Sequence, residues 1–452
     1  MKFVHTLMTA SLALAIVGQA QAAVSAAEAA KLGNELTLVG AEKAANADGS
    51  IPAYEGGLTT APAGFKAGDS MRPDPFAAEK PLLVIDGKNV EQYKGQLTAV
   101  TVELVKRYPS FRIEVFPTHR SAALPQGVLD NTVKNATAAK STDGGNAIEN
   151  ALPGVPFPIP QSGAEAMWNH LLRYQGVNIA MKYDNWNVDA AGVASLATTG
   201  IGQINYAAYD DLTKQLMAKD TYYQVKLAYT GPARRAGEAV LLRDAVNPLE
   251  QPRRGWQYLP GQRRVKLAPS LAYDTPNPGT AGAATWDDSF VFNGALDRYD
   301  WKLVGKQEMI VPYNAYRVTY ANDLKQLTTP GHMAPELVRW EKHRVWVVEA
   351  TLKADARHIY AKRRFYLDED SWVALASDQY DARGQLYRGV YTFLSQSYDQ
   401  QVPDATPYAV YDLIGGTYSV VGLSGPYGGL KYSQPLSNTQ WSPESLAGAG
   451  IR

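Results

Sequence analysis

From residue 221 to residue 425 the chain alternates short runs of aromatic, β-branched and aliphatic residues with brief polar turns. Runs such as YYQVKLAY (222–229), HRVWVVEATL (343–352) and QLYRGVYTFLSQSY (385–398) repeat with a period of two, which is typical of β-strands. The turn DARG begins with Asp381 and ends with Gly384, as a type I turn prefers. Short strands joined by short turns predict one large antiparallel sheet.

The predicted strands are apolar on both faces. In LYRGVYTFL one face carries Tyr387, Tyr391 and Phe393, and the other face is aliphatic. A sheet that is apolar on both faces has to be covered on both, or has to leave one face lining a cavity. We therefore expect an α+β fold in which a curved antiparallel half-barrel is covered by helices, which are predicted at 89–108 and 163–175.

The N-terminal residues 1–22 have the features of a secretory signal peptide. Lys2 precedes an apolar stretch over 6–18, and Ala20-Gln21-Ala22 forms a small-x-small cleavage site. The rest of the chain is then predicted to divide into four parts. These are an extended N-terminal arm (23–88), a helical and loop region packed on the sheet (89–220), the half-barrel (221–425) and a C-terminal tail (426–452).

Composition limits which cellular compartment and which classes of binding partner the sequence predicts. The chain has no cysteine, which excludes disulfides, thiolate metal sites, a cysteine nucleophile and lipidation of an N-terminal cysteine. No later stretch reaches 18 consecutive apolar residues, so no transmembrane helix is predicted. Lys plus Arg and Asp plus Glu both number 44, and this balance speaks against nucleic-acid binding. We expect a soluble exported protein of the periplasm.

Catalytic signatures are missing from the sequence. It contains no GxxxxGK[ST], no GxSxG and no HExxH motif. GIGQIN (200–205) lacks the third glycine of a dinucleotide loop and follows no predicted strand. We therefore predict that the protein is not an enzyme and uses no cofactor, and we keep a hydrolase as the least favoured alternative.

Charged residues in the predicted strands have mainly structural interpretations. His343 and His358 flank a hairpin near Glu349, but this spacing is too unspecific to predict a metal site. The acidic run DED (368–370) is interpreted as a solvated hairpin tip. Asp378 is expected to pair with an arginine on a neighbouring strand, namely Arg363, Arg364 or Arg388.

Two longer stretches carry a family resemblance. YLPGQRRVKLAPSLAYDTPNP (258–278) and KRRFYLDEDSWVALASDQYDARGQLYR (362–388) resemble a large family of exported Gram-negative proteins of unknown function. That family is similar to outer-membrane lipoprotein-sorting proteins and is related in fold to the periplasmic lipoprotein carriers LolA and LolB. The resemblance implies a half-barrel with an apolar cavity for acyl chains. It also implies work near the outer membrane, beside an exporter of the resistance-nodulation-division type or an outer-membrane protein.

The favoured function is that of a non-enzymatic periplasmic carrier for a hydrophobic ligand, either a lipid or a lipoprotein acyl chain. Burial of an acyl chain contributes about 0.8 kcal/mol per methylene, which can hold a lipid without chemistry. The alternative is an accessory or scaffold protein of an envelope export complex, with its cavity filled. Six residues are predicted to line the cavity: Trp346, Val348, Trp372, Tyr387, Tyr391 and Phe393.

Overall fold

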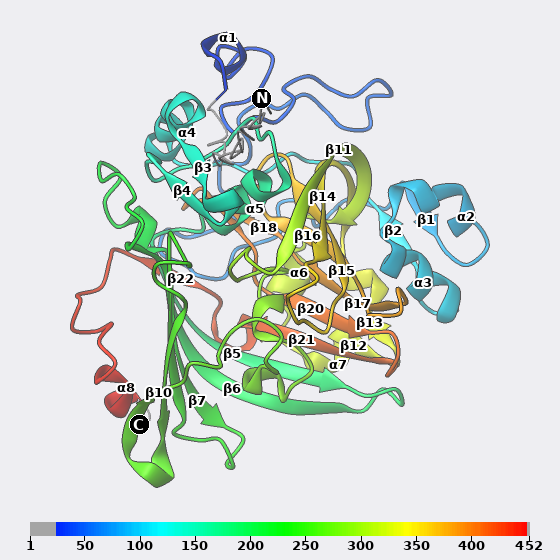
Figure 1. Cartoon of the computed structure of the whole chain (residues 1–452). Helices are drawn as coiled ribbons and strands as arrows, with labels where there is room; N and C mark the ends of the chain where they lie inside the picture. The colour runs from blue at the N-terminus through cyan, green and yellow to red at the C-terminus, as the bar shows by residue number, and fades with distance from the viewer. Residues whose placement is uncertain (1–23, 450–452) are drawn as a thin grey trace, which may run out of the picture.

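A 16-stranded sheet dominates the computed structural model, which describes residues 24–449 (Figure 1). The predicted signal peptide lies outside the described residues. Along the main path the strands are, in order, β1 (Leu83–Ile85), β2 (Ile113–Val115), β14 (Trp340–Leu352), β15 (Lys362–Asp368), β16 (Ala374–Tyr380), β17 (Leu386–Thr392), β20 (Tyr408–Asp412), β21 (Thr417–Leu423), β5 (Asn178–Val188), β6 (Ala194–Asn205), β7 (Thr221–Gly231), β8 (Ala239–Ala245), β9 (Arg254–Leu259) and β10 (Arg264–Leu267). Two further strands join it, β11 (Tyr299–Pro312) beside β14 and β22 (Lys431–Ser433) beside β5.

The remaining elements are short. Three two-stranded ribbons pair β3 (Lys140–Thr142) with β4 (Ala147–Glu149), β12 (Thr328–Thr329) with β13 (His332–Met333) and β18 (Ser395–Ser397) with β19 (Val402–Asp404). The α-helices are α1 (Ala26–Ala29), α2 (Val90–Tyr93), α3 (Ala99–Arg107), α4 (Gln126–Ala138), α5 (Gly163–Leu171), α6 (Tyr316–Thr319), α7 (Leu324–Leu327) and α8 (Ser445–Ala449). Single 3-10 turns include η5 (Pro278–Thr280) and η6 (Trp286–Asp288).

The predicted large antiparallel sheet is confirmed, and it is curved and not closed. Apart from a single parallel bridge between Trp340 and Val115, its strands pair antiparallel. Irregularities interrupt the register between Asn185 and Trp186 and between Thr199 and Gly200, where long strands bend. Such bulges increase local twist and curvature. In Figure 1 the green strands β5–β10 form the lower part of the sheet, and α4 and α5 lie at the top.

The sheet begins earlier in the chain than predicted. The helical and loop region expected over 89–220 contains β5 and β6, two of the longest strands of the sheet. Alternating apolar residues also predict strands in DSFVFNG (288–294) and NAYRVTYA (314–321), and both predictions are wrong. Residues 288–294 are mostly loop that follows η6, and 314–321 contains helix α6. Local composition favoured strands in both segments, but the tertiary contacts described below hold 288–294 as a loop.

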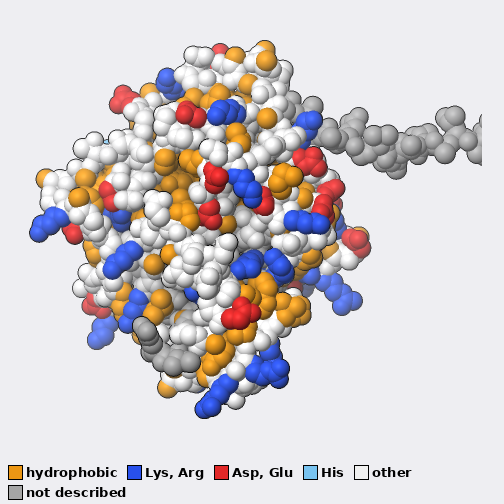
Figure 2. All heavy atoms as spheres, turned by 90° about the vertical axis from the view of Figure 1, so that its left-hand side faces the viewer, with side chains coloured by type: hydrophobic (Ala, Val, Ile, Leu, Met, Phe, Trp, Pro, Cys, Tyr) orange, Lys and Arg blue, Asp and Glu red, His pale blue; other side chains and the backbone are white. Residues whose placement is uncertain are grey.

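Much of the sheet is covered on both faces, but parts of β6 and β10 stay open, where Ile201 is 47% and Leu267 61% exposed. On the outer face of β7–β10 the C-terminal tail packs Trp441 and Leu446 against Leu241 and Tyr258. Lys226 Nζ fastens the tail by donating to the backbone oxygen of Gln440 at 2.8 Å. Figure 2 shows the side of the molecule that carries α8 and β10, where hydrophobic side chains gather in patches between charged ones.

The N-terminal arm is an ordered, extended segment, and the hairpin between β15 and β16 forms hydrogen bonds with it. The Glu369 carboxylate accepts from the backbone N–H of Glu42 at 3.1 Å, and Trp372 Nε1 donates to the Val39 oxygen at 3.0 Å. Apolar residues spaced along the arm predict anchors for it: Ile51 is buried and serves as one, whereas Leu82 is 74% exposed and does not.

The helix predicted over 89–108 is broken in two, because Leu97 has extended backbone between α2 and α3. Thr98 caps α3, and the Asp378 carboxylate accepts from the backbone N–H groups of Ala99 and Val100 at 3.0 and 2.9 Å. Asp378 therefore binds the positive end of a helix, and the arginine pair predicted for it is not formed.

Candidate ligand-binding cleft

A largely apolar cleft lies between the strands β5–β8, β20 and β21 and the segment 277–293. Its empty volume is about 680 Å³ when the part open to solvent is counted, and the centre of a water-sized molecule can occupy about 80 Å³ of it. The apolar side chains of the lining are those of Met181, Tyr183, Ile204, Tyr223, Val225, Leu227, Leu242, Trp286, Phe290, Tyr408 and Val421. A narrow space with such walls suits an apolar ligand.

Strand β5 supplies one wall of the cleft, and its sequence explains why. In NIAMKYDNWNV the side chains of Met181, Tyr183 and Asn185 point to one face because side chains alternate along a strand. Across the strand pair, a Cβ on Gly200 would lie 2.7 Å from the Tyr183 ring. Glycine at this position thus makes room for a buried aromatic wall, and GIGQIN has a packing role inside β6. Apolar residues recur at every second position over 179–183, and this pattern indicates a strand that was not predicted above.

The segment 277–293 covers the cleft with strained backbone. Phe290, which lines the cleft, has φ of 55°, and Val291 next to it has φ of 72°. A β-branched residue rarely adopts positive φ, because each such residue costs about 1–3 kcal/mol and the conformation persists only where its surroundings impose it. Strain of this kind is common in segments that clamp ligands.

Buried charge pairs impose this conformation. Arg363 on β15 donates from Nη1 to Oδ2 of Asp287 at 2.8 Å and from Nη2 to Oδ1 of Asp288 at 3.3 Å. His358 Nε2 lies 3.0 Å from the same Asp287 oxygen, and Tyr360 donates its hydroxyl to Asp288 at 2.9 Å. Burial alone would raise the pKa of Asp287, but Arg363 and His358 outweigh it and hold the pKa below its usual range. The pairs fix the covering segment to the sheet.

Polar side chains also line the cleft, namely those of Asn185, Arg253, Asn277, Ser289, Asn293 and Thr406. The indole Nε1 of Trp286 is buried without a hydrogen-bond partner among the described residues. Arg253 is paired with Asp244 through two contacts of 2.6 Å, and it also donates to the Asn293 oxygen at 3.1 Å. An unpaired buried donor is costly, so a ligand with an acceptor atom would satisfy Trp286.

The cleft lining offers little for acid–base chemistry. Within the described part of the chain, no histidine, carboxylate or lysine lines it. Burial raises the pKa of Tyr183 and Tyr223 well above that of a free tyrosine, so both hydroxyls stay neutral. The arrangement is suited to holding a molecule.

The six residues predicted to line a cavity lie elsewhere. Val348 and Trp372 are fully buried, and Trp346 stacks on Trp372 with ring centres 6.0 Å apart. None of the six is among the residues that line the cleft described above.

The other three predicted residues lie on β17 or next to it. Tyr391 is buried, and its hydroxyl lies 2.7 Å from that of Thr101 on α3. Tyr387 is half-buried with Arg388 over its ring, and Phe393 is buried. Their surroundings are those of packed core, and a role of any of the six in ligand binding stays a prediction.

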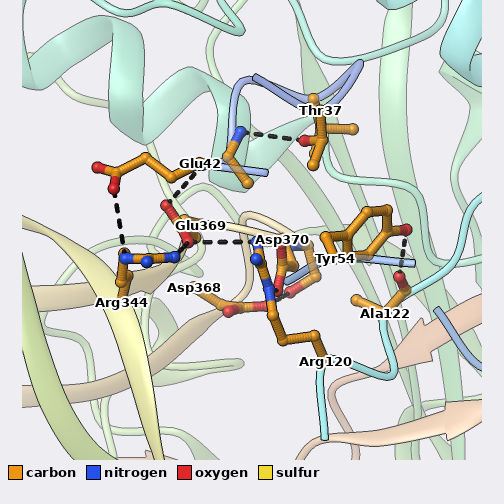
Figure 3. Close-up of polar contacts among 12 residues, drawn as sticks. Thr37, Glu42, Tyr54, Arg120, Ala122, Arg344, Asp368, Glu369 and Asp370 are labelled. Atoms are coloured by element: carbon orange, nitrogen blue, oxygen red, sulfur yellow. Dashed lines mark hydrogen bonds and ion pairs between the residues drawn. The ribbon is translucent and has the colours of Figure 1, made fainter. Parts of the chain in front are cut away.

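The acidic run 368–370 is not solvated, which corrects the interpretation as a hairpin tip. Asp368, Glu369 and Asp370 are at most 3% exposed, and Figure 3 shows them beside Arg120 and Arg344. Burial and the neighbouring Asp370 raise the pKa of Asp368 to about 6. His343 and His358 do not form a common site, because His343 pairs with Glu341 and His358 with Asp287. Tertiary packing buried these charges, and local sequence gave no sign of it.

Among residues 24–449, no helix has the length and apolar character needed to cross a bilayer.

Solved structures with some likeness to this chain include three related domains. A protein from Desulfovibrio piger, described as a DUF1329 family protein, matches 60% of this chain and 92% of its own length, at 16% identity and a TM-score of 0.41. A Vibrio parahaemolyticus domain named for outer membrane lipoprotein sorting matches 63% and 98%, at 16% identity and a TM-score of 0.43. A LolA superfamily protein of Nitrosomonas europaea matches 63% and 100%, at 12% identity and a TM-score of 0.38. These scores describe a partial likeness.

Sequence comparison reaches further along the chain. An uncharacterized protein of Pseudomonas aeruginosa is 41% identical over 463 aligned positions, which cover 99% of this chain and 98% of that protein. The profile of the family described as protein of unknown function DUF1329 matches residues 84–447. The resemblance noted in the sequence is thereby confirmed, and the chain belongs to the DUF1329 family.

Proposed function

We propose that the protein is a non-enzymatic binding protein of the periplasm that holds a hydrophobic ligand, such as a lipid acyl chain, in the cleft under segment 277–293. The observation that carries the proposal is the cleft itself, whose walls are built from aromatic and aliphatic side chains of β5–β8, β20 and β21. The signal peptide predicted over residues 1–22 supports the compartment.

The ligand is expected to carry one polar acceptor group. An acyl chain would bury its methylenes against side chains such as Leu227 and Val225, at about 0.8 kcal/mol per methylene. The Trp286 indole N–H and the nearby Asn293 amide are the polar groups that a carboxylate or ester oxygen could meet. Transfer of the ligand to an exporter or an outer-membrane protein belongs to the same proposal.

Native mass spectrometry of the protein purified from a periplasmic extract tests the proposal, together with titration of a fluorescent fatty acid. Leu227→Asp places a charge on the half-buried wall of the cleft and should lower the affinity at least tenfold, because a charge in an apolar site is strongly unfavourable. Ile201→Asp is the matched control, since Ile201 lies on the neighbouring strand and is 47% exposed.

The two variants separate the possible outcomes. Equal binding by Leu227→Asp and wild type would show that the cleft is not the site. A wild-type protein that carries no lipid and takes up no fatty acid would contradict the proposal. That result would favour the alternative function, an accessory or scaffold protein of an envelope export complex.

A further inference from the structure

Three buried side chains meet where β15 ends beside β14 and the following hairpin begins. Potential ligand atoms of His343, Asp368 and Asp370 all lie within 4.8 Å of one another. His343 is 1% exposed, Asp368 0% and Asp370 3%. None of the three lines the ligand-binding cleft.

One carboxylate oxygen of Asp368 is hydrogen-bonded, and the other has no hydrogen-bond partner among the described residues. Its Oδ2 accepts from the Tyr313 hydroxyl at 3.0 Å, and from the backbone N–H and hydroxyl of Ser371 at 3.0 and 2.5 Å. Its Oδ1 is buried and has no hydrogen-bond partner among residues 24–449. Nor does any Lys or Arg of that range pair with Asp368. An unpaired buried carboxylate oxygen requires either a proton or a cation.

His343 is oriented as metal-binding histidines usually are. Its Nε2 lies 3.0 Å from Oε2 of Glu341, and its ring stacks on Tyr313 at 3.7 Å. A carboxylate at one ring nitrogen fixes the orientation of the imidazole and leaves the other nitrogen for a ligand bond. Arg339 in turn holds Glu341 through a contact of 2.5 Å.

Asp370 is the third side chain, and Arg120 already pairs with it through contacts of 2.6 and 2.9 Å (Figure 3). Each carboxylate oxygen has two lone pairs, so Asp370 can keep this partner and still face an ion. Asp370 also borders a second cleft between the N-terminal arm and α4, which is lined by Tyr54 and Leu129 and gives a path from solvent.

We propose that His343, Asp368 and Asp370 form a binding site for a divalent transition-metal ion. One imidazole nitrogen and two carboxylate oxygens are ligands that Zn²⁺ and Mn²⁺ accept. Zn²⁺ bonds of about 2.1 Å allow ligand atoms at most about 4.2 Å apart, so the ligands close slightly around the ion.

The ion would brace the N-terminal arm. Arg120 and Glu369, which flank Asp370, contact the arm at the Pro52 oxygen and the Glu42 N–H. Fixing Asp370 fixes these contacts, and metal binding then stabilises the folded chain by mass action.

The test uses the full mature chain, stripped with EDTA and titrated with ZnCl₂ or MnCl₂ alone by isothermal titration calorimetry and by elemental analysis. We expect about one ion per chain and a melting temperature that rises with the ion concentration. Glu341→Gln leaves the three ligands in place and should weaken binding about 10–100-fold, since it removes the carboxylate behind the imidazole. Asp368→Asn and His343→Gln should weaken it further.

His358→Gln is the matched control, because His358 is equally buried and also lies beside a carboxylate but outside the cluster. It should bind the ion as the wild type does. Wild-type protein that binds neither metal overturns the proposal without any variant, so a variant that fails to fold leaves the test intact. Undiminished binding by folded His343→Gln and Asp368→Asn would place the ion elsewhere and overturn it as well.

Discussion

Nη1 of Arg363 lies 2.8 Å from Oδ2 of Asp287, and both side chains are buried. Arg363 belongs to β15 and Asp287 to the segment that covers the ligand-binding cleft, 76 residues away. The cleft therefore keeps its cover through an ion pair inside the protein.

Replacing Arg363 should destabilise the fold. Arg363→Met leaves Asp287 and Asp288 buried without their cation, and losing one partner of a buried pair costs about 3–5 kcal/mol. Urea unfolding followed by tryptophan fluorescence measures the loss. Arg364→Met is the control, because Arg364 pairs with half-buried Glu349 and should cost no more than about 1 kcal/mol. Equal losses in both variants would argue against the anchoring role of Arg363.

A side chain at position 200 should disturb the wall of the cleft. In Gly200→Ala the new methyl group would lie 2.7 Å from the Tyr183 ring, which would have to shift toward the cleft that it lines. We expect a loss of about 1–3 kcal/mol in stability from overpacking, together with weaker uptake of fatty acid. The same titration measures uptake. A variant with wild-type stability and uptake would show that Tyr183 moves freely.

Stability should depend on pH through Asp404. Its Oδ2 is buried without a partner among the described residues, and burial raises the pKa from 3.8 to about 7. The folded state then binds this proton more tightly than the unfolded state does. The contribution of Asp404 to the free energy of unfolding is largest below about pH 4 and falls as the pH rises to 7, by up to about 4 kcal/mol at 1.36 kcal/mol per unit.

Asp404→Asn cannot titrate at this position and should flatten that decline. Denaturant unfolding at pH 5 and pH 8 gives the slope for both proteins. Parallel slopes in wild type and variant would assign the pH dependence to other groups.

A variant of Tyr391 can distinguish a role of this residue in core packing from a role in ligand binding. Its hydroxyl bonds to Thr98 and Thr101 at the start of α3, so Tyr391→Phe should cost about 1 kcal/mol and leave fatty-acid uptake unchanged. Thermal unfolding and the uptake titration check the two effects. Uptake that falls with the hydroxyl would support the lining role predicted for Tyr391 from the sequence.

The sequence by itself determined the class of the fold. Period-two runs such as 343–352 and 385–398 became β14 and β17, since alternation along a strand follows from local backbone geometry. The family could be recognised from the stretches 258–278 and 362–388. Strand β5 carried the same signal and could have been predicted, whereas glycine-rich β6 gave a weaker one.

Only the tertiary structure decided which part of the concave face stays open. Trp372 and Tyr391 look like lining residues in the sequence, but the arm and α3 pack against them and fill their space. The acids 368–370 look solvated, yet Arg120, 249 residues away from Glu369, lies beside them in the interior. Periodicity reports which face of a strand is apolar. Which segment comes to cover that face depends on contacts between distant residues, and these form only when the whole chain folds.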